Sequence, residues 1–309
     1  MDFKQIEAFI NVVRYKSFSK AAKAIYLSQP TISTHINNLE TELKTSLFER
    51  SSKEVRLTPA GELFYKYALD MINTRNQAFQ SIAEYYGRIE GELKIASSTT
   101  PCKWILPKVI SDFSKLYPLV NFKISGISTG EVISSVLMYD AELGIVGKKI
   151  PDAKLEYYGF ADDNLVAITP PNEKFNNISE DSISFKDLMH ESFILREQSS
   201  ATRQVFEAAL ISSGYDINKL KIISEVRGME TALEFVKSGL GVTIISQNVV
   251  KEYMDLKYVR MFHIKDLDLK RKIYLVKQKK RTLSPPARVF EKFILSKNFI
   301  GRHHNIQKP

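Results

Sequence analysis

The apolar positions near the start of the chain recur at the spacing of an α-helix. They lie three or four residues apart, which predicts a helix with one apolar face. They are Phe3, Ile6, Phe9, Ile10 and Val13. A second helix is predicted over a group of small residues, with Ser17 or Ser19 as its N-cap, because small side chains let two helices pack closely. These small residues are Ala21, Ala22 and Ala24.

A third predicted helix, from Ser28 to Leu43, separates apolar from polar positions sharply. Ser28 is a suitable N-cap, and Pro30 is tolerated in the first turn because its missing N–H would have no partner there. The inward positions repeat at i, i+4, i+7 and i+11 and are Ile32, Ile36, Leu39 and Leu43. At about 100° per residue the outward positions are Pro30, Ser33, Thr34, Asn37 and Asn38, with His35 between the two faces.

Two helices, a tight turn and a polar outer face are typical of a helix-turn-helix with its recognition helix at 28–43. Short hydroxyl and amide side chains suit base edges and phosphates in a major groove. An ordinary three-helix bundle with a solvated polar face has the same pattern. The positions predicted nearest the bases are Gln29, Ser33, Thr34 and Asn37. The full set of candidate DNA contacts on this helix is Ser28, Gln29, Pro30, Thr31, Ser33, Thr34, His35, Asn37 and Asn38.

The segment after this helix favours the DNA-binding interpretation. It carries three cations, Arg50, Lys53 and Arg56, in a short turn between the apolar stretches 47–48 and 55–57. A hairpin wing of this kind would place the cations beside phosphates, as backbone contacts require.

A long helix is predicted to start at Thr58 and Pro59 and to run to about Tyr86. At 1.5 Å per residue it would be a rod of about 40 Å. A small domain cannot bury an apolar stripe of that length, so the helix indicates a partner helix and a dimer. The stripe consists of Phe64, Tyr67, Ala68, Met71, Ile72, Phe79, Ile82 and Tyr86, and Gly87 and Gly91 then mark a hinge.

From residue 93 onward strands and helices alternate, which predicts an α/β domain with largely parallel sheets in two lobes. The predicted strands are 93–97, 120–127, 142–147, 165–169, 193–197, 220–226 and 241–246. The predicted helices lie near 104–117, 131–139, 201–213 and 229–238. A later strand at 271–277 is expected to return to the first lobe, before a final helix near 286–296 and a frayed tail.

Composition narrows the class of protein. The chain has 309 residues, enough for two or three domains, and a net charge of +9 that favours a polyanionic partner. A single cysteine, Cys102, excludes an intramolecular disulfide and favours a reducing cytoplasm. The first residues lack the apolar region of a signal peptide, and no apolar run has the length of about 20 residues that a bilayer needs, so no membrane partner is expected.

The chain resembles the LysR-type transcriptional regulators over nearly its whole length. The similarity rests on AFINVVRYKSFSKAAKAIYLSQPTIS, LFERSSKEVRLTPAGELF, LPKVISDFSKLYP and SGLGVTIIS. It implies an α plus α/β fold: a winged helix-turn-helix DNA-binding domain at 1–58 and a linker and dimerisation helix with a hinge at 59–90. A two-lobed effector-binding domain like the periplasmic binding proteins would follow at 91–300, with a tail at 301–309. The resemblance also implies homodimers or homotetramers on double-stranded DNA. One position departs from the family, which usually has arginine where this chain has Thr34.

No enzyme chemistry stands out. The five histidines show no metal-ligand spacing, and no phosphate-binding loop or nucleophile motif occurs, so no catalytic residue, metal or cofactor is expected. Cys102 falls near a predicted helix N-terminus, where a thiolate is favoured, but a structural small residue is the preferred interpretation over redox sensing or nucleophilic catalysis. The basic run at 277–281 is typical of a solvated turn. A small-molecule binding protein or enzyme with a helical appendage stays the alternative to a DNA-binding regulator.

Two polar clusters, SSTTP at 97–101 and EQSSATR at 197–203, lie where a predicted strand ends and a helix begins. In open α/β sheets ligands bind beyond the carboxyl ends of strands, and helix N-termini attract anions. Plain N-caps would give the same pattern. The candidate effector-binding residues are Ser98, Thr99, Thr100, Ser199, Ser200 and Thr202, with Ser128 and Gly147 at the rim. The effector domain most resembles regulators associated with sulfur or selenium metabolism, which implies a small oxyanion or an acetylated amino-acid precursor.

Overall fold

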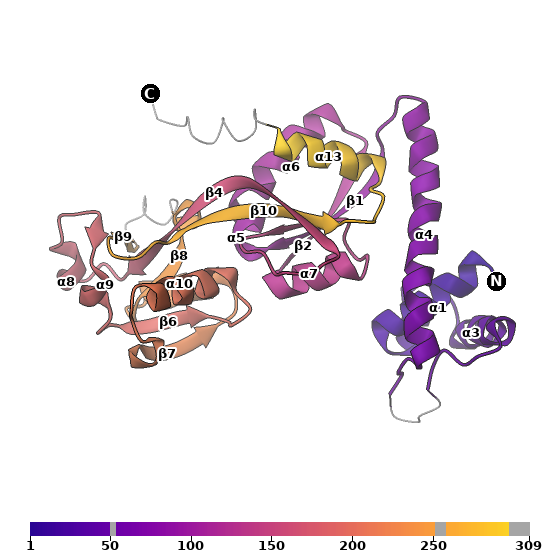
Figure 1. The fold of residues 1–309 in the computed structure, drawn as a ribbon, viewed down its shortest axis with the longest axis horizontal. Coiled ribbons are helices and arrows are strands. Elements are labelled where there is room, and N and C mark those ends of the chain that lie inside the picture. The colour runs from indigo at the N-terminus through magenta and orange to yellow at the C-terminus, as the bar shows by residue number, and fades with distance from the viewer. Residues whose placement is uncertain (50–53, 251–257, 297–309) are drawn as a thin grey trace. The chain divides into compact units, whose positions relative to one another are not determined.

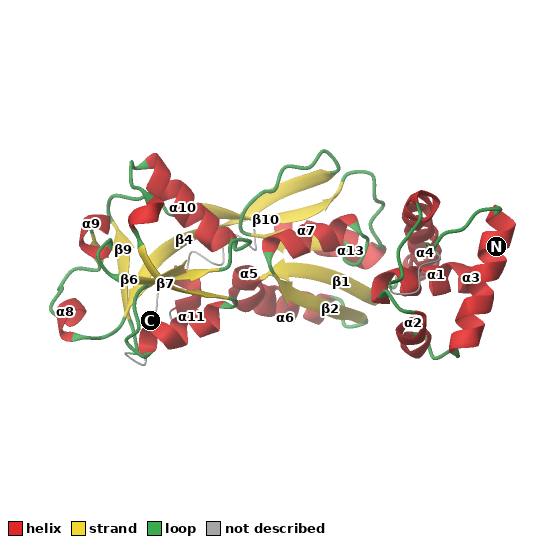
Figure 2. Cartoon of the chain, turned by 90° about the horizontal axis from the view of Figure 1, so that it is seen from below, coloured by secondary structure: helices red, strands yellow, loops and turns green. Residues whose placement is uncertain are grey.

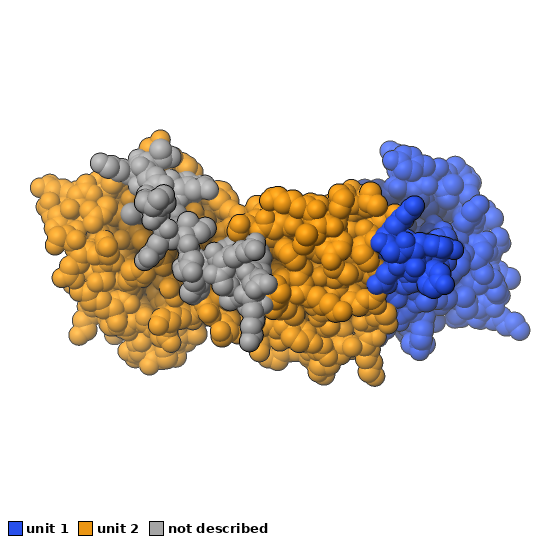
Figure 3. Space-filling view, turned by 90° about the horizontal axis from the view of Figure 1, so that it is seen from above, with its two compact units in different colours: residues 1–88 blue, residues 89–309 orange. Residues whose placement is uncertain are grey.

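The computed structural model describes residues 1–49, 54–250 and 258–296. The chain divides into two compact units, Met1–Arg88 (unit 1) and Ile89–Pro309 (unit 2), which Figure 3 colours separately. The predicted tail at 301–309 lies outside the described residues. Within the described ranges, no helix has the length and apolar character that crossing a bilayer requires.

Unit 1 is helical, and each helix starts at a side-chain cap. Its helices are α1 Phe3–Tyr15, α2 Phe18–Ala24, α3 Gln29–Leu43 and α4 Pro59–Tyr85 (Figure 1). Their N-caps are Asp2, Ser17, Ser28 and Thr58. Each cap oxygen accepts a backbone N–H that the first turn leaves without a partner. The predicted starts of the recognition helix and of the long helix are therefore confirmed.

The core of unit 1 forms around Phe9, whose ring lies 5.4 Å from that of Phe48 and 5.2 Å from that of Phe64. Ala21 and Ala22 are buried as predicted, whereas Ala24 is exposed because α2 ends there. The remaining buried side chains that complete this core include Ile6, Ile10, Ile32, Ile36, Leu39, Leu47, Ala68 and Leu69.

Gly61 fixes the wing against α4. A Cβ atom at this position would lie 2.1 Å from the carbonyl oxygen of Leu47. Only glycine allows the helix to approach the wing backbone this closely. The base of the wing is a short antiparallel pairing, in which Phe48 bridges to Leu57 and the Glu49 N–H donates to the Arg56 carbonyl at 2.9 Å.

Unit 2 contains a first lobe, lobe I, with helices on both faces of its strands. Its strands are β1 Gly91–Ser98, β2 Val120–Ile127 and β3 Leu143–Val146, joined by the adjacent halves of β4 Leu155–Thr169 and β10 Lys270–Gln278. Helices α6 Leu106–Leu116 and α13 Pro285–Leu295 share one core with the sheet, and α7 Thr129–Leu137 packs in the other. The short helix α5, Thr99–Trp104, follows β1.

Lobe II repeats this layering with other elements (Figure 2). Its strands are β5 Ser182–Ile183, β6 Ser192–Arg196, β7 Lys221–Val226, β8 Thr243–Ser246 and β9 Arg260–Ile264, with the far half of β4. Helices α8 Glu173–Asn176, α9 Phe185–Leu188 and α10 Ala201–Ser212 lie on one core, and α11 Met229–Lys237 lies on the other. Successive residues of β4 alternate between these cores, as strand geometry requires.

The two lobes are joined by β4 and β10, which pair antiparallel along their lengths. Their register shifts between Ile273 and Tyr274, which leaves Phe160 as an extra residue on β4. Such a bulge bends a strand and increases its twist. The sheet is mixed rather than largely parallel, because the pairings of β4 and β10 with their neighbours run antiparallel, whereas β1–β2, β1–β3 and β6–β7 are parallel. The expected return of the late strand to lobe I is confirmed.

Candidate nucleic-acid interface and interlobe cleft

The polar face of α3 has the arrangement that the periodicity predicts. Ile32, Ile36 and Leu39 are at most 3% exposed, whereas Leu43 at the helix end is half-buried. The residues that lie on the exposed side are Ser28, Gln29, Pro30, Thr34, Asn37 and Asn38, with Thr31, Ser33 and His35 half-buried beside them. Unit 1 therefore has a polar helix face available to a partner.

Several hydroxyls on this face are already bonded. Ser28 Oγ accepts the Thr31 N–H at 3.2 Å as the helix cap, and Ser19 donates to the side-chain oxygen of Gln29 at 2.7 Å. The Thr34 hydroxyl donates to the Pro30 carbonyl at 3.0 Å. The O–H of Thr34 is therefore occupied, whereas its oxygen can still accept a hydrogen bond and its methyl group can still contact a partner such as DNA.

Four other side chains on the face are less committed. In the part of the chain that the structure describes, the side chains of Ser33, His35, Asn37 and Asn38 make no hydrogen bond. Amide side chains can donate and accept, so the two asparagines can form paired hydrogen bonds with a base edge.

The wing supplies one described cation. Arg56 lies 2.7 Å from Glu54, and both side chains are about two-thirds exposed. This hydrogen bond raises the pKa of Arg56 and lowers the pKa of Glu54. An exposed pair of this kind is weak, so Arg56 can exchange its partner for a phosphate. The other two predicted wing cations, Arg50 and Lys53, lie outside the described residues.

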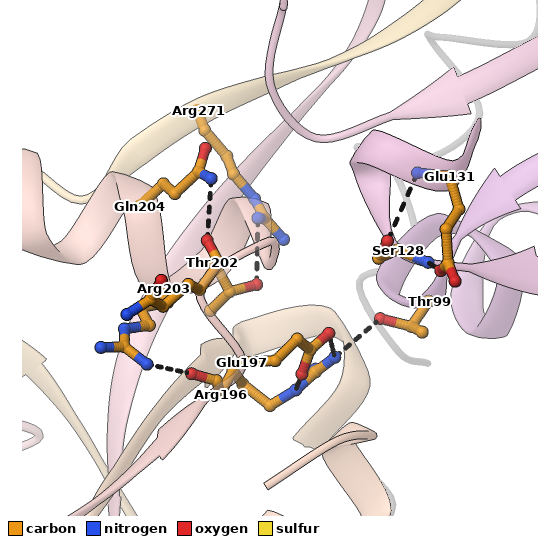
Figure 4. A network of polar contacts seen from close by, with 10 residues as sticks. Thr99, Ser128, Glu131, Arg196, Glu197, Thr202, Arg203, Gln204 and Arg271 are labelled. Carbon is orange, nitrogen blue, oxygen red and sulfur yellow. Dashed lines mark hydrogen bonds and ion pairs between the residues drawn. The ribbon is translucent and has the colours of Figure 1, made fainter. Parts of the chain in front are cut away.

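In unit 2 the two polar clusters come together in a cleft between the lobes (Figure 4). Lobe I contributes the end of β1, the start of α5 and the start of α7, and lobe II contributes the end of β6 and the start of α10. The residues that line the cleft are Ser98, Thr99, Thr100, Ile127, Ser128, Thr129, Arg196, Glu197, Ser200, Ala201, Thr202 and Arg271. Most of the predicted effector residues are thus on one surface, although they lie about a hundred positions apart in sequence.

Two predicted residues fall outside this lining. Ser199 is exposed, and Gly147 is buried behind the cleft. A Cβ at Gly147 would lie 3.0 Å from Nη1 of Arg271 and 3.5 Å from the Ala201 Cβ. Gly147 therefore leaves room for the arginine, a supporting role that differs from the predicted place at the rim.

The serines at the helix starts are not equivalent. Ser128 forms a capping box with Glu131: the Ser128 N–H donates to the carboxylate at 2.8 Å, and the hydroxyl accepts the Glu131 N–H. Ser98 and Ser200 occupy the N-cap positions of α5 and α10, but neither side chain bonds to its own helix. Both are at most 7% exposed. Both residues also line the cleft, so they are buried there without capping a helix, which the plain N-cap alternative does not explain.

Arg196 is the first cation of the cleft. Its Nε and Nη2 donate to the two carboxylate oxygens of Glu197 at 3.0 and 2.9 Å. Nη2 also lies 3.5 Å from the hydroxyl of Thr99, so this side chain reaches from lobe II to lobe I. Arg203 donates to the Arg196 carbonyl at 2.9 Å and so holds its backbone.

Arg271 is the second cation. Its Nε donates to Asp163 at 2.9 Å and its Nη1 donates to the Thr202 hydroxyl at 3.1 Å. Its Nη2 is 2.8 Å from the same carboxylate oxygen, an ion contact without hydrogen-bond geometry. Asp163 also accepts hydrogen bonds from Ser246 and Asn248. This network puts a buried, fully paired charge beside Thr202.

One further hydroxyl points to a ligand. Thr129 is 3% exposed and lines the cleft, and its Oγ1 has no hydrogen-bond partner among the described residues. A buried polar atom without a partner costs free energy. An added polar ligand in the cleft would remove that cost.

The cleft is narrow in this arrangement. The empty space among its lining residues is about 230 Å³, but the centre of a water molecule can reach only about 10 Å³ of it. That is room for about one water. A larger ligand therefore requires the lobes to separate or a lining side chain to move.

Cys102 has the surroundings of a structural residue. It is half-buried, and its Sγ would lie 3.2 Å from a Cβ at Gly126. Burial raises the pKa of the Cys102 thiol, and the charge of Glu230 raises it further. Both effects oppose the thiolate that a helix start would favour, and they agree with the structural role expected for this residue.

The sequence reasoning missed Arg196, Glu197, Arg271, Asp163 and Thr129. Arg196 ends an apolar strand directly before the predicted cluster, and Glu197 is the first residue of that cluster, so a charged pair at the strand end was an available signal. Arg271 and Asp163 are 108 positions apart and meet only through the pairing of β10 with β4. No spacing in the sequence indicates such a contact.

Comparisons with known proteins agree with this architecture. The family model described as LysR substrate binding domain matches residues 87–298, and the model described as bacterial regulatory helix-turn-helix protein, lysR family, matches residues 3–62. The HTH-type transcriptional regulator CysL of Bacillus subtilis is 34% identical over 273 residues, covering 88% of this chain and 90% of that protein. A probable RuBisCO transcriptional regulator of Emiliania huxleyi is 31% identical over 294 residues, covering 94% and 93%.

Solved structures show the same fold. A full-length OxyR variant from Pseudomonas aeruginosa superposes with a TM-score of 0.69 at 19% identity, covering 95% of this chain and 93% of that one. Full-length CbnR in complex with its target DNA superposes with a TM-score of 0.67 at 21% identity, covering 95% and 99%.

The Asp163–Arg271 pair generates a stability prediction. We expect Asp163→Asn to lower the free energy of unfolding by about 3–5 kcal/mol, because Arg271 would keep a buried charge without a counter-charge. Urea denaturation of the full chain measures this. Asp162→Asn is the matched control, since its pair with Lys272 is more than half exposed and its loss should have little effect. If Asp163→Asn and Asp162→Asn lowered the free energy of unfolding equally, the buried pair would not stabilise unit 2 more than an exposed pair does.

Proposed function

We propose that this protein, which belongs to the LysR family of DNA-binding transcriptional regulators, contacts its operator through the polar face of α3 and responds to a small anion in the interlobe cleft. As a member of this family, the chain is a DNA-binding regulator with an effector-binding domain and is not an enzyme. The alternative of a binding protein or enzyme with a helical appendage is therefore wrong. We assign residues 1–58 to DNA binding, 59–90 to linkage and dimerisation, and 91–300 to effector binding, and we place the protein in the cytoplasm with its DNA.

The DNA contacts that we propose follow from the chemistry of α3 and the wing. Gln29, Ser33, Thr34 and Asn37 would lie nearest the bases, and Arg56, with Arg50 and Lys53, beside phosphates. Asn37 carries a side chain without an internal partner, which supports a role in base recognition. Base contacts set sequence preference, whereas phosphate contacts add affinity for every sequence.

An anionic effector is supported by the polar groups that converge on the cleft. Two buried arginines, the start of α10, and the hydroxyls of Thr100, Thr129 and Ser200 lie on its surface. Arginine and helix N-termini both favour anions with several oxygens. Candidate effectors of this class are sulfate, thiosulfate, selenite and O-acetylserine, which would bind through its carboxylate. The single observation that carries this proposal is that Ser98 and Ser200 are buried in the lining of the cleft and occupy cap positions without bonding to their own helices.

Assembly through α4 is supported by the apolar side chains that unit 1 leaves exposed. Phe79 and Ile82 are 65% and 60% exposed on this helix, as are Leu63 and Tyr67 to a similar extent. Exposed apolar residues at helical spacing favour a helix partner. We propose a dimer through α4, and a tetramer through further contacts of the effector domains. Two recognition helices related by symmetry require an imperfect inverted repeat in the operator.

The first prediction from this proposal concerns operator recognition. We expect Thr34→Ala to change which duplexes are preferred, because a base contact contributes about 1–3 kcal/mol of discrimination. Thr41→Ala is the control: its hydroxyl also donates within α3, to the Asn37 carbonyl at 2.8 Å, but near the other end of the helix. Band-shift titrations with a duplex from the protein's own upstream region and a random duplex measure both.

In the same assay, Arg56→Ala should weaken binding to both duplexes equally. It should also reduce the slope of log affinity against log salt concentration by about 1, since it removes one phosphate contact. If Thr34→Ala and Arg56→Ala bound both duplexes like the parent, this face would not be the DNA-binding surface.

The second prediction concerns assembly. We expect Phe79→Glu with Ile82→Glu to halve the mass measured by light scattering, because buried charges would disrupt helix pairing. Ser81→Glu is the control, since Ser81 is exposed on another side of α4. Met71 and Ile72, which belong to the apolar stripe predicted from the sequence, are half-buried, so charges there would disturb unit 1 itself. If the Phe79→Glu, Ile82→Glu variant kept its mass and bound the operator with full affinity, pairing through α4 and the inverted repeat inferred from it would be contradicted.

The third prediction concerns the effector. Calorimetry with sulfate, thiosulfate, selenite and O-acetylserine should give one ligand whose binding Thr100→Ala and Thr202→Ala weaken by about tenfold or more, since each removes a buried hydrogen bond to an anion. Ser199→Ala is the control, because Ser199 lies outside the cleft. A tight ligand insensitive to both threonine substitutions would place the site elsewhere, and binding of only neutral apolar compounds would exclude an anionic effector.

A further inference from the structure

The positive charges of the two arginines in the cleft are already balanced, because each arginine has a carboxylate partner. Arg271 is paired with Asp163, and Arg196 is paired with Glu197. Two cations and two anions cancel. An anionic effector that entered this arrangement would find its cations occupied.

The two carboxylates are held very differently. Asp163 is a strand residue with a side chain 0% exposed, and Ser246 and Asn248 donate to it in addition to Arg271. Glu197 follows the end of β6, and its side chain is 15% exposed and lines the cleft. Within the described ranges, the carboxylate of Glu197 has hydrogen bonds only to Arg196. Rotation of the Glu197 side chain would therefore break no other hydrogen bond of the carboxylate.

The contact between Glu197 and Arg196 has the geometry of a bound anion. Two carboxylate oxygens accept from Nε and Nη2 of one guanidinium at 3.0 and 2.9 Å. Such bidentate pairs are among the strongest and most directional hydrogen-bonded contacts. The Arg196 side chain is 5% exposed, and its Nη2 lies next to Thr99 of the other lobe. Glu197 thus occupies the position in the cleft where a carboxylate or oxyanion ligand would bind.

We propose that Glu197 is a tethered competitor of the effector: its carboxylate occupies the anion-binding edge of Arg196, and the effector binds by displacing it. This inference rests on the proposed anionic effector of the same cleft. It also defines the chemical class of the ligand. The displacing group must present two oxygens at carboxylate-like spacing, as carboxylates and tetrahedral oxyanions do, whereas a halide cannot replace both hydrogen bonds.

A tethered competitor lowers affinity without changing the site. The apparent dissociation constant equals the intrinsic constant divided by the fraction of molecules in which Arg196 is free. If Glu197 occupies Arg196 for about nine-tenths of the time, the effector binds about tenfold more weakly than the cleft itself would allow. The same displacement exchanges a contact confined to lobe II for a ligand that can also reach the hydroxyls of lobe I.

The test removes the carboxylate and keeps its shape. Sulfate binding to the full chain is measured by calorimetry and by thermal-shift titration, with sodium chloride at matched ionic strength. Glu197→Gln should bind sulfate about tenfold more tightly than the parent, and chloride should have the same effect on both proteins. The matched control is Glu191→Gln, because Glu191 precedes β6 as Glu197 follows it and is also ion-paired, with Lys174, but lies outside the cleft.

The outcomes separate this inference from the proposed site. If Glu197→Gln binds sulfate as the parent does, or does not bind it, the tethered competitor is overturned. Weaker binding overturns it as well, because the carboxylate would then contribute to ligand binding. Thr202→Ala, added to the parent and to Glu197→Gln, tests the cleft itself. Sulfate binding that is equal in parent and Glu197→Gln but lost with Thr202→Ala overturns the competitor and leaves the site standing. Tighter binding in Glu197→Gln that Thr202→Ala abolishes supports both.

Discussion

The buried ion pair between Asp163 and Arg271 is the contact on which the geometry of unit 2 depends. The two residues face each other across β4 and β10, at the point where the chain passes between the lobes. Burying two charges costs several kcal/mol per ion, and hydrogen bonds from Ser246 and Asn248 to Asp163 and from Arg271 to Thr202 offset part of that cost. The pair therefore fixes the positions of β4 and β10 relative to the start of α10, which lines the cleft.

Away from these strands, polar and apolar contacts between the lobes are found among the described residues. Arg196 reaches Thr99, and Lys103 lies 3.1 Å from Glu230. Trp104, the only tryptophan of the chain, packs against a core of each lobe. Such an interface can adopt a second arrangement, and an effector shifts that equilibrium only through a difference in its affinity for the two states. The cleft, where one ligand would touch both lobes, is suited to produce that difference. If effector binding changes the affinity for DNA, DNA binding must change the affinity for the effector by the same factor.

Much of the fold could be predicted from the sequence because its signals are local. The caps Ser28 and Thr58 and the apolar spacing of α3 lie within a few residues of the helices that they define. Residues 155–164 of β4 could not be predicted in this way, because this part of the strand has exposed polar positions such as Asp162 and Asn164 and so lacks a regular apolar pattern. The cleft was predicted as far as its hydroxyls, which mark strand ends. Arg271 was not predicted, because it lies 69 positions from Thr202 and a single sequence carries no sign of their contact. Arg196, by contrast, directly precedes the predicted cluster and could have been included.

The most direct measurement of the central claim, an anion held between the two lobes by Arg196, is a crystal structure of the full chain soaked with selenate. Selenate has the shape and charge of sulfate, and the anomalous signal of selenium locates it without ambiguity. We expect a selenium peak between Thr100 and Thr202, with the oxygens of selenate bonded to Arg196 and the Glu197 side chain rotated away. A peak elsewhere in the molecule, or a peak in the cleft with Glu197 still bonded to both nitrogens of Arg196, would contradict it.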